Sequence, residues 1–188
     1  VEGGWDYLTY DAPSNRLFIT RGTRVQVVDP DNGVVLAEIA DTPGVHGVAL
    51  ASEFGKGYTS NGGDNSVTVF DLKTLQPLTR IAITGGEHPD FIAYDHVAKR
   101  IFAFNGRSHN VSVIDAADDK LVGTIKLSGK PESAVTDGKG MIFVDIEDKN
   151  EITAINTQKA VVVATWPLTG CEEPAGLAID QQTRRLFV

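Results

Sequence analysis

Histidine, carboxylate and arginine side chains recur in the polar loops of this 188-residue chain, at positions that repeat along the sequence. Imidazole with carboxylate suits a divalent transition metal, and carboxylate with asparagine suits calcium. The same residue types also occur in ordinary solvated loops, and no HxH, HExxH or CxxC spacing favours a metal. We therefore expect no cofactor, with a divalent metal as the alternative. The candidate ligand-binding residues are His46, His88, Asp90, Arg107, His109, Glu132 and Glu173.

Two other segments have competing interpretations. Arg107 and His109 lie in the run Asn-Gly-Arg-Ser-His-Asn, which is either a recognition loop or an ordinary hairpin in which glycine supplies a positive φ. We favour the hairpin. Cys171 is a structural thiol, half of a disulfide with a residue outside this segment, or a loop ligand beside Glu172 and Glu173. No catalytic residue is predicted, because a nucleophile needs a positioned base and no Gly-x-Ser-x-Gly elbow is present.

The elements that would position these loops form a repeat of about 40 residues. A basic or small residue followed by an apolar–aromatic strand recurs five times. The spacings between successive anchoring aromatics are 40, 44, 41 and 44 residues. A fixed period of this length is typical of solenoids and propellers. The anchoring aromatics are Phe18, Tyr58, Phe102, Phe143 and Phe187.

A second marker keeps phase with the first. It is a β-branched alternating strand closed by Asp or Asn, as in Val67–Asp71 and Val111–Asp115. A turn, a longer strand, a Gly/Pro loop and a strand of small apolar residues complete each unit. Each unit therefore contains four short strands, and it shows no helical periodicity. Four-stranded units of this length predict the blades of a β-propeller, whereas the rival β-sandwich does not require a strict repeat.

The predicted fold is all-β: a propeller segment of four four-stranded blades plus the first strands of a fifth. The blades cover approximately 5–44, 45–88, 89–130 and 131–173, with a partial blade at 174–188, and we expect the segment to be truncated at both ends. The small-residue strand, which contains Ala49, Ala93, Ala134 or Ala178, is expected to lie innermost, where space is tight. Loops that lead into it would converge on the mouth of the central channel.

The repeat resembles the YVTN family of β-propeller repeats. The resemblance lies in Tyr58-Thr-Ser-Asn61, Ile101-Phe-Ala-Phe-Asn105 and Val111-Ser-Val-Ile-Asp115, and it covers residues 5–188. It implies about seven blades in the parent protein and a signal peptide for export to the periplasm or cell surface. Arg21 and Ile146 depart from the asparagine of the pattern, which argues against the same ligand contact in every blade.

Composition restricts the partners. The formal net charge is −8, which disfavours nucleic acid because such binding draws on lysine and arginine. No apolar run approaches the roughly 20 residues of a membrane span.

We predict a non-catalytic scaffold for a protein, peptide or small-molecule ligand, with a metal-dependent hydrolase or lactonase as the alternative. A module serving an electron-transfer partner is a third possibility, without a haem or copper motif to support it. The remaining blades of the parent, or self-association through open blade edges, would cover the two ends.

Overall fold

The computed structural model describes residues 4–188, and every regular element in that range is either a β-strand or a 3₁₀ helix of one turn. The strands form four four-stranded antiparallel sheets and one two-stranded sheet, each in simple chain order. The first sheet contains β1 (Leu8–Asp11), β2 (Arg16–Thr20), β3 (Val25–Val28) and β4 (Val35–Ile39). The second contains β5 (Val45–Ala51), β6 (Lys56–Asn61), β7 (Ser66–Asp71) and β8 (Pro77–Ala82).

The remaining sheets repeat the same order. The third contains β9 (Pro89–Asp95), β10 (Arg100–Asn105), β11 (Asn110–Asp115) and β12 (Lys120–Lys126). The fourth contains β13 (Pro131–Thr136), β14 (Met141–Ile146), β15 (Glu151–Asn156) and β16 (Val161–Pro167). The last contains β17 (Ala178–Asp180) and β18 (Arg185–Phe187). The 3₁₀ turns are η1 (Ser52–Phe54) and η2 (Glu147–Lys149).

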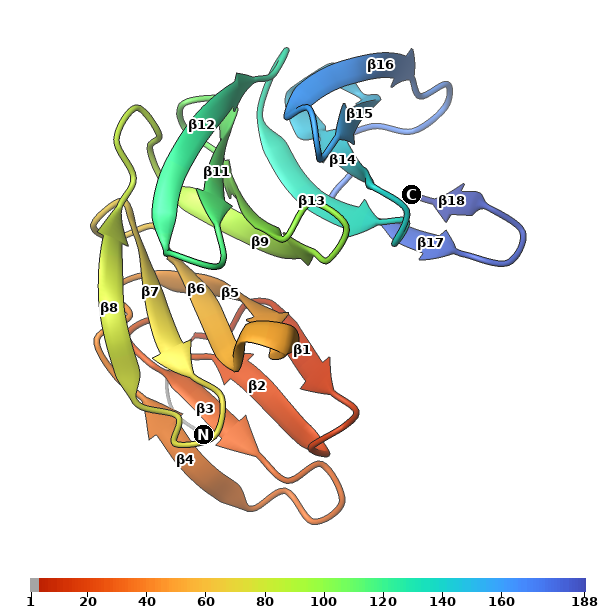
Figure 1. Cartoon of the computed structure of the whole chain (residues 1–188). Helices are drawn as coiled ribbons and strands as arrows, with labels where there is room; N and C mark the ends of the chain where they lie inside the picture. The colour runs from red at the N-terminus through yellow and green to blue at the C-terminus, as the bar shows by residue number, and fades with distance from the viewer. Residues whose placement is uncertain (1–3) are drawn as a thin grey trace.

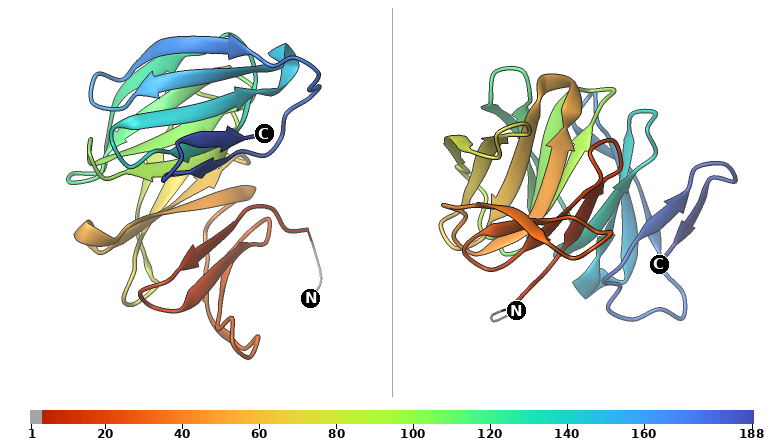
Figure 2. Two further views of the ribbon diagram at one scale, coloured as in Figure 1. Left: turned by 90° about the vertical axis from the view of Figure 1, so that its right-hand side faces the viewer. Right: turned by 90° about the horizontal axis from the view of Figure 1, so that it is seen from below.

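Successive sheets follow one another around an arc, with the first strand of each sheet on the inner side (Figure 1). The two further views show the sheets side by side like blades, not as two face-to-face layers (Figure 2). This arrangement confirms the predicted propeller segment and rules out the sandwich. The small-residue strands lie innermost, as predicted, and the last strand of each four-stranded sheet lies on the outside (Figure 1).

The anchoring aromatics explain how neighbouring blades hold together. Phe18, Tyr58 and Phe102 are fully buried, and each belongs to a core cluster that includes residues of the next sheet. Phe143, the equivalent residue of the fourth sheet, is only partly buried and packs near Trp166, with ring centroids 6.4 Å apart. Phe187 is 58% exposed. The anchoring aromatic of a sheet is therefore fully buried where the next sheet along the chain has all four strands, and it is less buried where that sheet is incomplete or missing.

The asparagines of the YVTN-like strands stabilise hairpins. Asn61 is fully buried, and its Nδ2 donates hydrogen bonds to Ser66 Oγ (3.1 Å) and Thr68 Oγ1 (2.8 Å) on the next strand. Asn105 is also fully buried, and its Nδ2 donates to Asn110 Oδ1 (2.7 Å) and to the hydroxyl of a serine on β11. Buried amides need such partners, so these asparagines link strands. Among residues 4–188, no helix is long and apolar enough to cross a membrane.

Candidate functional site at the channel mouth

Each four-stranded blade places a polar side chain at one equivalent position, which lies in the innermost strand of the second, third and fourth sheets and two residues before β1 in the first. Strand pairing places one innermost residue opposite each anchoring aromatic, and the polar position lies three residues earlier. The aromatic partners are Thr9, Ala49, Ala93 and Val135. The polar residues are Asp6, His46, Asp90 and Glu132. Because blades are related by rotation about one axis, equivalent positions converge near the channel.

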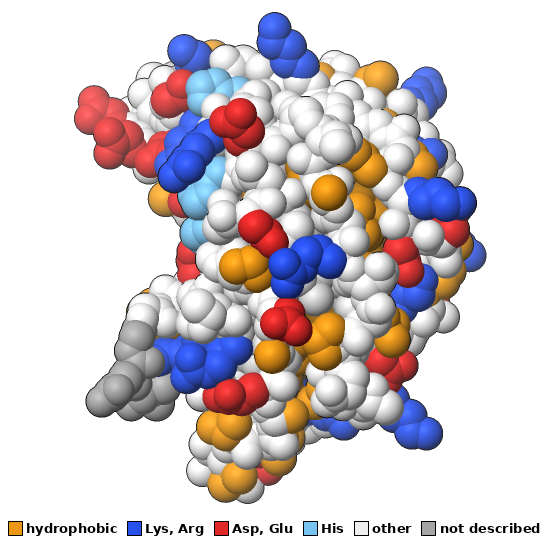
Figure 3. Space-filling model, turned by 90° about the vertical axis from the view of Figure 1, so that its left-hand side faces the viewer, with side chains coloured by type: hydrophobic (Ala, Val, Ile, Leu, Met, Phe, Trp, Pro, Cys, Tyr) orange, Lys and Arg blue, Asp and Glu red, His pale blue; other side chains and the backbone are white. Residues whose placement is uncertain are grey.

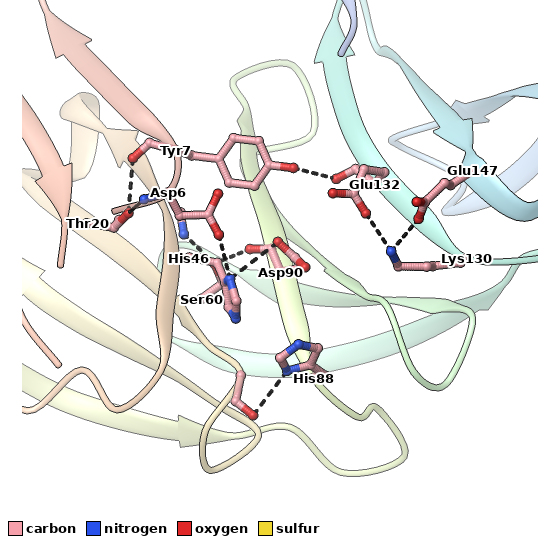
Figure 4. Close-up of polar contacts among 12 residues, drawn as sticks. Asp6, Tyr7, Thr20, His46, Ser60, His88, Asp90, Lys130, Glu132 and Glu147 are labelled. Carbon is pink, nitrogen blue, oxygen red and sulfur yellow. Dashed lines mark hydrogen bonds and ion pairs between the residues drawn. The ribbon is translucent and has the colours of Figure 1, made fainter. Parts of the chain in front are cut away.

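His46 is held between two carboxylates (Figure 4). Its Nδ1 lies 2.7 Å from Asp6 Oδ2 and 3.7 Å from Asp90 Oδ1. The side chains of His46 and Asp90 are 22% and 14% exposed, whereas that of Asp6 is 42% exposed. An ionised carboxylate can only accept, so the contact with Asp6 places a proton on Nδ1 of His46, and in the neutral tautomer of the ring the lone pair is on Nε2.

His88 approaches the same place from the loop before β9. Its ring centroid lies 4.9 Å from that of His46, and the two planes are 87° apart. Nδ1 of His88 lies 3.3 Å from the carbonyl oxygen of Gly62. The residue has a positive φ of 58°, and its backbone N–H donates to Asn65 Oδ1 at 2.7 Å, which fixes the turn. Burial lowers the pKa of His88, so its neutral form is favoured.

Asp90 is the most buried carboxylate of this group. Burial raises its pKa to about 6; His46 opposes the increase, and neighbouring Glu132 and Asp6 add to it. The backbone around Asp90 is fixed by Ser60, whose hydroxyl donates to the Asp90 carbonyl and accepts from Gly47 N–H at 2.9 Å. One ligand atom each from His46, His88 and Asp90 lie within 4.8 Å of one another.

Glu132 lies on the other side of the mouth, in a separate ion-pair cluster (Figure 4). Lys130 Nζ is 3.0 Å from Glu132 Oε2 and also pairs with Glu147. These carboxylates raise the pKa of Lys130, so its ammonium stays charged. The Tyr7 hydroxyl donates to the Glu132 carbonyl oxygen at 3.0 Å and so connects the first blade to the fourth. Burial and the surrounding carboxylates raise the pKa of Tyr7, so the phenol stays protonated.

The other predicted site residues add no donor atom to the His46, His88 and Asp90 group in the described part of the chain, although Arg107 is close enough to His88 for its charge to help lower the pKa of that ring. Arg107 and His109 are exposed in the β10–β11 hairpin, and His109 has a positive φ of 51°, as a turn requires. Glu173 is the structural equivalent of His88: it has a positive φ of 49°, and its N–H donates to Asn150 Oδ1 at 2.8 Å. Its side chain is exposed. Cys171 is a free, partly buried thiol.

Sequence reasoning missed Asp6 and Tyr7. A signal for Asp6 was present: it stands twelve residues before Phe18, and His46 stands twelve before Tyr58. Asp90 likewise stands twelve residues before Phe102, whereas Glu132 stands eleven residues before Phe143. Counting back from the anchoring aromatic would therefore have found Asp6.

The surface around the site combines opposite charges. In the space-filling view, histidine side chains gather with basic and acidic ones along one edge of the visible face (Figure 3). The ion pairs at the mouth, apart from the histidines, involve five ionisable side chains: Asp6, Asp90, Lys130, Glu132 and Glu147. Four of them are acids and one is a lysine, so this group is acidic in sum.

The blade order and the converging register position define a β-propeller with a polar channel mouth. No protein-family model matches the chain, and no curated protein gives a significant match. A solved structure, Kuenenia stuttgartiensis hydrazine synthase, superposes with a TM-score of 0.76 at 20% identity, over 92% of this chain and 50% of that one. The chain thus spans about half the length of that protein chain, and the likeness supports the fold.

Proposed function

We propose that this chain is a non-catalytic β-propeller binding module that uses the channel mouth to bind a positively charged group. The observation that carries the proposal is the convergence of Asp6, Asp90 and Glu132 from equivalent positions of three blades. Asp90 is 14% exposed and Glu132 is 22% exposed. Half-buried carboxylates facing a common opening attract cations more strongly than fully solvated ones, because the local dielectric is lower.

The proposed ligand is a lysine or arginine side chain of a protein or peptide partner. Lys130 already shows how the mouth accommodates an ammonium group, since it contacts both Glu132 and Glu147. An acidic mouth on a chain of net charge −8 disfavours nucleic acid. We further propose that the repeat belongs to the YVTN class and that the parent protein is exported to the periplasm or cell surface; the Asn-ending strands and the blade order support this assignment.

Binding can be tested with two peptides of equal length, one rich in lysine and arginine and one rich in glutamate, in buffer containing a chelator. We expect the basic peptide to bind more tightly, and Asp90→Asn and Glu132→Gln each to weaken it. Asp31→Asn, on an exposed residue outside the site, is the matched control because it also removes one negative charge. Equal binding of both peptides, or variants that bind like the parent, would overturn the proposal.

The metal-dependent hydrolase remains a second candidate because His46, His88 and Asp90 come together. Asp6 is paired with His46, so its carboxylate is placed to orient that ring and not to take a proton from a substrate water. Hydrolysis of ester or lactone substrates by the zinc-treated protein, abolished by Asp90→Asn, would establish the enzyme instead.

A further inference from the structure

We propose that His46, His88 and Asp90 hold a divalent first-row transition-metal ion at the channel mouth, with Asp6 orienting His46. The inference deepens the proposed function, since it names a metal cation as a ligand of the same mouth. It is carried by the geometry of four side chains from three different blades. We call these four residues the His–Asp cluster.

The donor set indicates the class of metal. Two imidazole nitrogens and one carboxylate oxygen suit zinc, cobalt, nickel, copper and ferrous ions, whereas magnesium and calcium prefer oxygen alone. One donor atom of each residue lies within 4.8 Å of the others. Zinc bonds of about 2.0–2.1 Å in a tetrahedral arrangement place neighbouring donors about 3.4 Å apart. Small side-chain rotations at these partly exposed residues would therefore close the site.

The hydrogen bonds of both rings follow the pattern expected of metal-ligating histidines. Such a histidine usually donates its second ring N–H to a carboxylate or a backbone carbonyl, which fixes the tautomer and the orientation of the ring. Nδ1 of His46 faces the Asp6 carboxylate at 2.7 Å, and Nδ1 of His88 faces the Gly62 carbonyl at 3.3 Å. Both partners accept from Nδ1, so in the neutral form that binds a metal the lone pair of each ring is on Nε2.

Gly62 leaves the space that the two rings occupy. A Cβ at this position would collide with Nδ1 of His88 and lie 2.8 Å from Nε2 of His46. Any other side chain there would push the imidazoles apart. Gly106 holds the equivalent place in the third blade: each glycine follows the buried asparagine that ends the strand and donates its N–H to a loop carbonyl at 2.9 Å. A Cβ at Gly106 would meet nothing closer than 3.9 Å.

Three protein donors leave at least one coordination position for an outside group. A carboxylate, imidazole or hydroxyl of a partner could complete the coordination, as water or substrate does in open zinc sites. The metal would then connect the channel mouth to whatever binds there. The neighbouring Lys130–Glu132–Glu147 ion pairs stay outside the coordination sphere. Asp6 and Asp90 serve both the metal and a cationic group, so the two ligands compete for these carboxylates and the peptide test is made in chelator.

The test is a titration of the chelator-treated protein with Co²⁺, read by its visible d–d absorption, followed by competition with Zn²⁺. We expect one Co²⁺ per chain, displacement by Zn²⁺, and no competition from Mg²⁺ or Ca²⁺. His46→Gln, His88→Gln and Asp90→Asn should each abolish the bands or weaken binding more than Asp6→Asn does. Asp6→Asn removes a supporting carboxylate and should weaken binding about 10–100-fold.

Gly62→Ala and Gly106→Ala form the matched pair. Gly62→Ala should weaken Co²⁺ binding although it changes no ligand, and Gly106→Ala should bind as the parent does. His96→Gln, on an exposed histidine away from the cluster, controls for adventitious surface binding. Circular dichroism confirms that each variant is folded. Absence of Co²⁺ bands in the parent, or bands that persist in both His46→Gln and His88→Gln, would overturn the inference.

The two proposals fail separately. A protein that binds the basic peptide in chelator but shows no Co²⁺ bands refutes the metal site alone. A protein that binds Co²⁺ but does not distinguish the two peptides refutes the cationic partner alone.

Discussion

Replacing Asp145 with asparagine should stabilise the protein at neutral pH and leave it little changed in acid. Asp145 is fully buried on β14, where its carboxylate accepts from Ser133 N–H at 2.6 Å and from Ser133 Oγ at 3.0 Å. Burial raises its pKa to about 6 although these bonds oppose the increase. The buried carboxylate is therefore costly when it is ionised.

The magnitude follows from the difference between folded and unfolded states. The unfolded chain loses this proton near the ordinary value of 3.8, whereas the folded chain keeps it until about pH 6. Between those values the folded state binds more protons, so the free energy of unfolding falls as pH rises. The difference between these two pKa values corresponds to about 3 kcal/mol, which is lost in full above about pH 6.

The asparagine side chain of the Asp145→Asn variant would keep an oxygen for the Ser133 N–H. It would also offer an N–H to the Ser133 hydroxyl, which can rotate to accept it. We expect a gain of about 1–3 kcal/mol at neutral pH, less any cost of imperfect fit. The assay is urea denaturation of parent and variant across the range from about pH 4 to about pH 7, where other titrating groups cancel in the difference.

Two results would refute this reasoning. The first is a stability difference between parent and Asp145→Asn that does not change with pH. The second is the same pH-dependent difference in Asp31→Asn, which removes an equal charge from an exposed turn without touching a buried contact. Either result would mean that the buried carboxylate does not titrate as argued.

The remaining predictions concern contacts between and within blades, all measured by urea denaturation. Phe102→Ala should cost about 3–5 kcal/mol because the ring is fully buried between two blades, and Phe143→Ala should cost less because its ring is only partly buried. Tyr58→Phe removes a hydroxyl that donates at 2.7 Å to a carboxylate of the next blade, and should cost about 1–3 kcal/mol. Gly57→Ala should cost about 1–3 kcal/mol because its Cβ would meet the Phe70 ring, and adding Phe70→Leu should recover part of this loss.

The fold could be predicted from the sequence because two independent markers recur in phase. The aromatic that ends up at a blade interface and the alternating strand that pairs with it are both required by burial, so each copy must keep them. Phe18, Tyr58 and Phe102 each lie in a core cluster shared by two neighbouring sheets. Phe143 and Phe187 bear the same sequence signal but are only partly covered, because burial depends on the neighbouring sheet and the repeat alone does not specify it.

The site could be predicted only in part. The sequence analysis assigned His46, Asp90 and Glu132 to loops that lead to the innermost strand, whereas the structure places each as the second residue of that strand. Their convergence still followed from the repeat, because they hold the same position in successive blades. Asp6 was missed because the small-residue pattern of the other innermost strands is absent from Leu8–Asp11, although its distance from Phe18 matches. The approach of His88 to His46 depends on a left-handed backbone turn and on the missing side chain of Gly62. Neither feature has a signature in residue type or spacing.

Core positions and mouth positions of the repeat differ in how freely their residues can vary, and this difference explains how a repeat protein can contain a binding site. Positions that face a neighbouring blade are restricted to aromatic, β-branched or small residues, because close packing tolerates little change in volume. The register position at the mouth faces an opening, so Asp6, His46, Asp90 and Glu132 can differ without disturbing the strands. Substitution there changes the chemistry of the mouth and leaves the fold intact. For this reason the position of Asp6, His46, Asp90 and Glu132, where the blades differ in polar type and face the opening, is where a ligand should be sought.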